Sequence, residues 1–67
     1  MTEPEEAAAS ILHDLHRAGK TAPASVRDAV QVVRERLPRA TDSEAYAIGD
    51  ALYCIVDRAR NGTEVAL

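Results

Sequence analysis

The residues best suited to metal chemistry are two histidines near the start of the chain. His13 and His16 are three residues apart, so on a helix both imidazoles face one side and approach a common metal ion. A structural zinc site needs four ligands, and the sequence marks out no third or fourth one. We therefore predict no metal and no other cofactor, and interpret both histidines as surface residues near a helix C-terminus, where the helix dipole favours their protonated forms.

The lone cysteine and a pair of carboxylates are weak signs of catalysis. Cys54 is flanked by apolar residues, which predicts a small buried packing residue rather than an activated thiolate. Asp50 and Asp57 share one helix face, but two turns separate them by about 10 Å, and a chain of 67 residues can hardly enclose a substrate cleft between them. We predict that the protein is not an enzyme. A metal or redox sensor built on the two histidines and Cys54 remains an alternative.

Both tyrosines belong to one row of a predicted helix. The row has spacings of 3, 4 and 3 and consists of Tyr46, Gly49, Tyr53 and Val56. A second apolar row lies beside it, formed by Ala45, Ile48, Leu52, Ile55 and Ala59, so the helix is apolar over more than the usual arc. Tyrosine is common at interfaces, and a glycine lets another backbone approach. We predict that the tyrosine row is a protein interface; the alternative is that the first helix covers it.

Charge is distributed unevenly along the chain. Residues 21–40 hold four arginines against two acidic residues, a net charge of +2, whereas residues 41–67 hold five acidic residues against two arginines, a net charge of −3. We assign Arg27 and Arg34 to the rim of the predicted interface. The alternative is a small nucleic-acid-binding transcriptional regulator that uses these arginines. It is disfavoured because the third helix is acidic, whereas a recognition helix presents positive charge to phosphates.

Three helices are predicted to position these groups within one domain, residues 1–62, with a frayed tail over 63–67. The helices are expected at about residues 3–18, 23–37 and 42–61. Gly19 is a left-handed terminator for the first, and the second begins at either Pro23 or Ser25. Thr41-Asp42-Ser43-Glu44 is a T-x-x-E capping box for the third.

The fold class predicted from these elements is all-α, a small three-helix bundle with short connections and antiparallel neighbours. A helical hairpin with a loosely attached first helix is the alternative. No run of 18 apolar residues is present, which excludes a membrane span. No secretory signal is visible, so we expect a cytoplasmic protein.

The expected function is that of a small protein–protein interaction module. A domain this small commonly needs a staple, and one cysteine cannot form an internal disulfide. Association is the remaining common staple, so we expect a homodimer, or a regulatory or adaptor subunit that docks on a larger protein through the third helix. The expected partner is therefore a protein, either the chain itself as a homo-oligomer or a larger one. We expect no membrane partner and regard nucleic acid as disfavoured.

Overall fold

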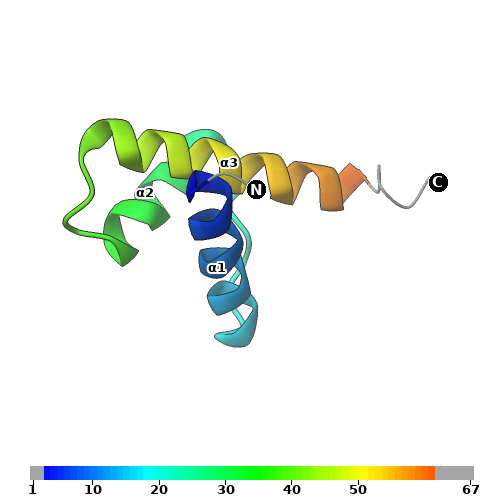
Figure 1. Cartoon of the computed structure of the whole chain (residues 1–67). Coiled ribbons are helices and arrows are strands. Elements are labelled where there is room, and N and C mark those ends of the chain that lie inside the picture. Colours follow the sequence, from blue (N-terminus) through cyan, green and yellow to red (C-terminus); the bar gives the residue numbers. More distant parts are fainter. Residues whose placement is uncertain (1–2, 62–67) are drawn as a thin grey trace.

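The fold, seen in a computed structural model that describes residues 3–61, consists of three helices (Figure 1). They are α1 (Glu3–Arg17), α2 (Val26–Arg36) and α3 (Asp42–Asn61). No strand occurs within residues 3–61, and the protein is all-α, a small three-helix bundle with short connections. The tail expected over residues 63–67 lies outside the described residues, as do residues 1–2 and 62.

Local capping explains where the helices begin and end. Gly19 follows α1 with φ of +70°, the left-handed conformation that glycine adopts without steric cost. Ser25 is the N-cap of α2, and its hydroxyl accepts from the backbone N–H of Asp28 at 3.1 Å. Of the two starts that the sequence left open, the structure shows the one at Ser25, because α2 begins at Val26 directly after it and Pro23 lies in the connection before the helix.

The expected capping box is present at the start of α3. The hydroxyl of Thr41 accepts from the backbone N–H of Glu44 at 3.1 Å. In return, the backbone N–H of Thr41 donates to the Glu44 carboxylate at 2.9 Å. These two bonds satisfy N–H groups that have no partner within the helix, and they fix the point at which the chain turns into α3.

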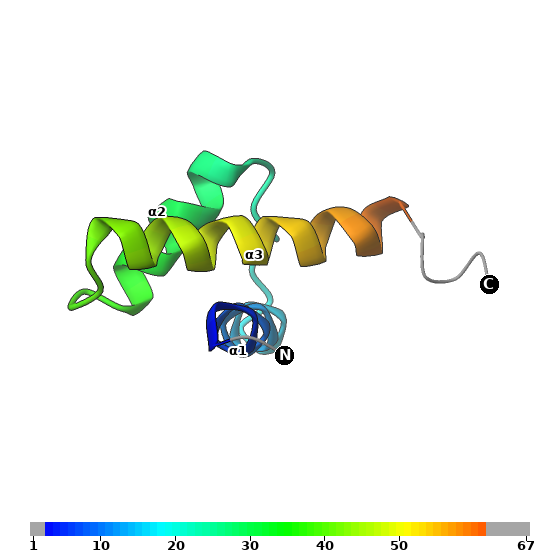
Figure 2. The same cartoon turned by 45° about the horizontal axis from the view of Figure 1, so that its top comes forward.

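The central element is α3, because α1 and α2 both pack on it and make only slight contact with each other. α2 crosses α3 obliquely, with its C-terminal end toward the start of α3, whereas α1 packs on another side of α3 and is seen end-on in Figure 2. The first helix is not loosely attached, since Ala8, Ile11 and Leu15 all belong to the buried core. The hairpin alternative is therefore not what the structure shows.

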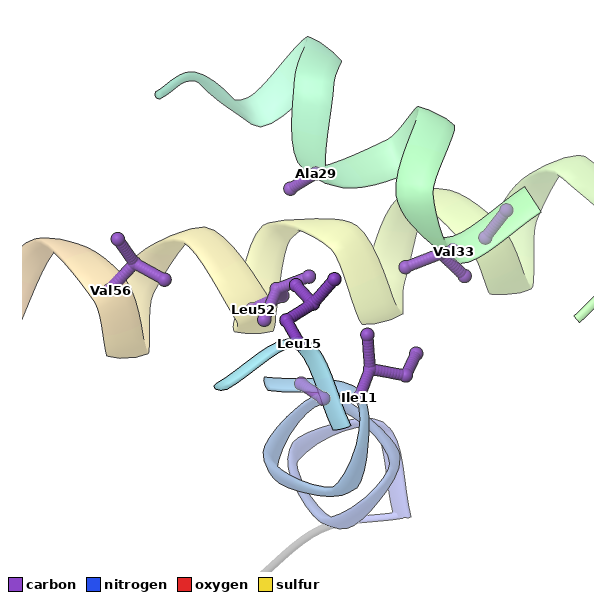
Figure 3. Close-up of a cluster of buried hydrophobic side chains, with 8 residues drawn as sticks. Ile11, Leu15, Ala29, Val33, Leu52 and Val56 are labelled. Atoms are coloured by element: carbon purple, nitrogen blue, oxygen red, sulfur yellow. The ribbon is translucent and has the colours of Figure 1, made fainter. Parts of the chain in front are cut away.

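The core lies where the three helices meet. Leu52 of α3 is completely buried, with side chains of α2 on one side of it and side chains of α1 on the other (Figure 3). The buried hydrophobic residues are small or medium in size: Ala8, Ile11, Leu15, Ala29, Val33, Ala45, Leu52 and Val56. Because many of these side chains are small, the helices approach one another closely. None of the helices within residues 3–61 has the length and apolar character needed to cross a membrane.

Candidate interaction face

The structure divides the tyrosine row between the core and the surface. Gly49 and Val56 are buried within the chain, and Tyr53 is half-buried against the core. Tyr46 is 62% exposed, the largest exposed fraction of any large hydrophobic side chain within residues 3–61. The predicted interface is therefore narrower than its four residues, because Gly49 and Val56 offer no surface to a partner of the folded chain.

The close approach at Gly49 involves the chain's own α2. A Cβ built on Gly49 would lie 2.6 Å from Cγ2 of Val30, 2.8 Å from its Cα and 2.9 Å from its backbone nitrogen. Only a residue without a side chain lets α2 come this near to α3. The glycine thus sets the distance between the two helices and brings the surface of α2 beside that of α3.

The first helix does not cover Tyr46. The N-terminal residues of α1 gather near Ile48 and Ala47, where Pro4 and Ala7 line a common hollow with them. Ile48 and Tyr46 are two residues apart, so they point to nearly opposite sides of the helix, about 200° apart. The alternative in which the first helix shelters the tyrosines therefore does not hold for Tyr46.

An open hollow between α2 and α3 brings three of the predicted site residues together. Arg27 and Arg34 of α2 line it with Tyr46 of α3, and Val30 contributes apolar surface between them. The remaining lining residues all belong to α2: Val26, Gln31 and Glu35. Two rim charges beside an apolar floor and an exposed tyrosine ring resemble the composition of protein interfaces, which favour tyrosine and arginine.

Two carboxylates extend this surface along α3. Tyr46, Asp50, Tyr53 and Asp57 follow one another at spacings of 4, 3 and 4, so they share one side of the helix. Asp50 is exposed and Asp57 is half-buried. Sequence reasoning considered these aspartates only as catalytic partners and missed their place in the surface, although their alternation with the tyrosines was visible. We name the α2–α3 face as Arg27, Gln31 and Arg34 of α2 with Tyr46, Asp50, Tyr53 and Asp57 of α3.

The charges of the α2–α3 face are largely unpaired within residues 3–61. Arg34 approaches Asp42 at 3.2 Å, but both side chains are well exposed, at 58% and 93%, and such pairs contribute little to stability. Arg27, Asp50 and Asp57 form no ion pair with any other described residue. The basic side of the face lies on α2 and the acidic side on α3.

A second hollow was not anticipated from the sequence. It lies where the start of α1, the α2–α3 connection and the first turns of α3 meet, and it includes Leu37, which is 38% exposed, and Ile48. α2 ends at Arg36, and Leu37 is its C-cap residue directly before Pro38. Each hollow holds about 780 Å³, so size does not distinguish them, whereas only the first gathers the predicted site residues.

The other chemistry-bearing residues form no site with one another. His13 and His16 are both exposed on α1. Across residues 3–61, no group of three or more His, Cys, Asp or Glu side chains is arranged to hold a metal ion. The prediction that Cys54 is buried was wrong, because it is exposed. Its place two residues from both Leu52 and Val56 turns it away from the core despite its apolar neighbours in sequence.

Comparisons with known protein families, with curated proteins and with solved structures each found no significant match.

Proposed function

We propose that this chain is a small protein–protein interaction module, and that the α2–α3 face is its contact surface. It acts either as a homodimer or as a regulatory or adaptor subunit docked on a larger protein. The observation that carries the proposal is the exposed ring of Tyr46 in a hollow that it shares with the apolar surface of Val30 and with two arginines, Arg27 and Arg34. A tyrosine so placed buries a large apolar area on binding while its hydroxyl keeps a polar partner.

Binding fits this surface better than catalysis. The hollow is open, and its lining residues pair no nucleophile with a general base within reach. The exposed thiol of Cys54 is free, which suits a reducing compartment, and we therefore include a cytoplasmic location in the proposal.

Nucleic acid fits the same surface less well. Arg27 and Arg34 supply two exposed positive charges, but Asp50 and Asp57 stand on the neighbouring helix. A phosphate backbone laid across the face would meet these carboxylates, and their repulsion offsets the attraction of the arginines.

Site-specific photo-crosslinking tests the proposal. We expect benzoylphenylalanine in place of Tyr46 to yield a discrete protein adduct in cells that express the chain, because the ring lies within the contact surface. The matched control carries the same probe at Ser10, an exposed position of α1, and should give no such adduct. Equal labelling from both positions, or none from position 46, would remove the α2–α3 face as a contact surface.

A further inference from the structure

We propose that the partner bound at the α2–α3 face is a second copy of this chain, with α2 of each protomer lying on α3 of the other. The inference rests on the proposed function and names its partner. It is carried by the order of charge across the face, where the exposed arginines Arg27 and Arg34 lie on α2 and the aspartates Asp50 and Asp57 lie on α3.

This order of charge makes the face complementary to itself. In a two-fold dimer the same patch is used on both protomers, so each residue must meet its complement across the axis. A two-fold axis within the plane of the face, directed midway between the two crossing helices, places α2 of one copy opposite α3 of the other. The basic row on α2, Arg27 and Arg34, then faces an acidic row rather than its own image.

The positions of the charged residues relative to the contact between α2 and α3 agree with this arrangement. α2 crosses α3 obliquely, with its C-terminal end toward the start of α3 (Figures 1 and 2), and it places Val30 against Gly49 and Arg34 near Asp42. Arg27, one turn before Val30, therefore lies on the side of this crossing toward which α3 continues after Gly49. A two-fold axis within the face then brings Arg27 toward Asp50 of the second copy.

The same face offers apolar contact and is not obstructed. Tyr46 and Tyr53 stand on either side of Asp50 in the row, and Val30 contributes apolar surface beside them. α1 occupies the side of α3 that carries Ile48, so the second copy approaches without meeting it. Because Arg27 and Asp50 pair with no other described residue, forming the intermolecular pair breaks no ion pair that the described part of the chain contains.

Reciprocal charge reversal tests the inference by sedimentation velocity over a concentration series. We expect the wild-type chain to dimerise, and Arg27→Glu and Asp50→Arg each to weaken the dimer by about 10- to 100-fold, since both symmetric contacts become repulsive. An equimolar mixture of the two variants should dimerise again. In the mixed pair, one contact joins Arg27 to Asp50 and the other joins the two substituted residues, so both contacts are attractive.

Arg58→Glu is the matched control, because Arg58 is an exposed arginine of α3 outside the face; it should leave the dimer unchanged, and circular dichroism should show all variants folded. A wild-type chain that stays monomeric up to about 0.5 mM, or single variants that dimerise as the wild type does, would overturn the inference. So would a mixture that stays monomeric. A monomeric wild type whose position 46 crosslinks to a larger protein would remove the second copy as partner while the proposed function stands.

Discussion

Gly49 is a residue at which helix propensity and packing oppose each other. Replacing it by alanine gains about 1 kcal/mol of helix propensity. The added methyl group, however, would meet backbone atoms of Val30 at 2.8 and 2.9 Å, which cannot rotate away. Overpacking of this kind costs about 1–3 kcal/mol, so we expect Gly49→Ala to lower the free energy of unfolding by up to about 2 kcal/mol, as measured by urea denaturation.

The control for Gly49→Ala is the reverse change at an exposed position of the same helix. Ala47→Gly removes helix propensity at an exposed position and should cost about 1 kcal/mol. Because Val30 presents backbone as well as a methyl group to Gly49, adding Val30→Ala should restore only part of the loss. A Gly49→Ala chain more stable than the wild type would show that α2 has room to move away.

Glu44 gives the capping box a pH dependence. The backbone N–H of Thr41, and secondly its hydroxyl, hold the pKa of this carboxyl below its ordinary value of 4.5. A lowered pKa means that the ionised form stabilises the fold at pH values above the ordinary pKa, and that this stabilisation is lost as the pH falls through the lower folded value. In Glu44→Gln the group no longer titrates. We expect the stability difference between wild type and variant to be constant above about pH 5 and to shrink below the ordinary pKa.

Urea unfolding between about pH 2.5 and 6 measures this difference. Glu35→Gln, which neutralises an exposed carboxylate outside any cap, controls for the change in net charge. A difference that stays constant down to the lowest pH would mean that the Thr41 bond does not favour the ionised carboxyl.

At the scale of the elements, α3 holds the other two helices together through Leu52. This side chain is completely buried where α1 and α2 approach α3 from different sides (Figure 3). Truncation of a buried leucine to alanine costs about 2–5 kcal/mol, and a domain of this size has about 3–5 kcal/mol in total. We expect Leu52→Ala to be largely unfolded at 25 °C by circular dichroism, whereas Leu37→Ala, at a partly exposed position, should stay folded.

Helix boundaries were predictable from the sequence because capping is local. Thr41 and Glu44 are three residues apart, and both of their hydrogen bonds follow from that spacing. The sequence did not predict which helix packs against each side of α3. The spacing of the tyrosine row indicated that a backbone approaches Gly49, but that backbone belongs to Val30, 19 residues earlier in the same chain. Likewise, the apolar neighbours of Cys54 in the sequence predicted that it is buried, but they do not share its side of the helix, and Cys54 is exposed.

At the scale of the whole molecule, the two sides of α3 differ in whether the chain itself covers them. One side is covered by α1 and completes the core, and the α2–α3 face remains open. A chain with one self-complementary face forms a closed dimer rather than a filament, because pairing consumes the face of both copies. Dimerisation through this face would also stabilise the fold, since a partner that binds only the folded chain shifts the folding equilibrium by mass action.

The melting temperature is therefore expected to depend on concentration. Raising the wild-type chain from about 5 to 500 µM should raise its Tm by several degrees, since a gain of about 1 kcal/mol shifts Tm by about 4–8 °C in a domain this small. Arg27→Glu, in which the proposed dimer is expected to be about 10- to 100-fold weaker, should show a smaller rise in Tm over the same range. A wild-type Tm that does not change with concentration would contradict the prediction, because it would mean that association does not stabilise the fold.

The net charge of the α2–α3 face bears on whether its partner is a protein or a nucleic acid. Two arginines on α2 face outward beside two aspartates, and the chain carries a net charge of −3. We expect no detectable binding to generic duplex DNA in a fluorescence anisotropy titration at about 50 mM salt, where phosphate contacts are strongest. The variant Asp50→Asn/Asp57→Asn keeps the arginines and removes the neighbouring carboxylates. If the variant binds and the wild type does not, repulsion by the aspartates is what keeps nucleic acid from the face; wild-type binding that falls steeply with salt would instead favour the regulator alternative.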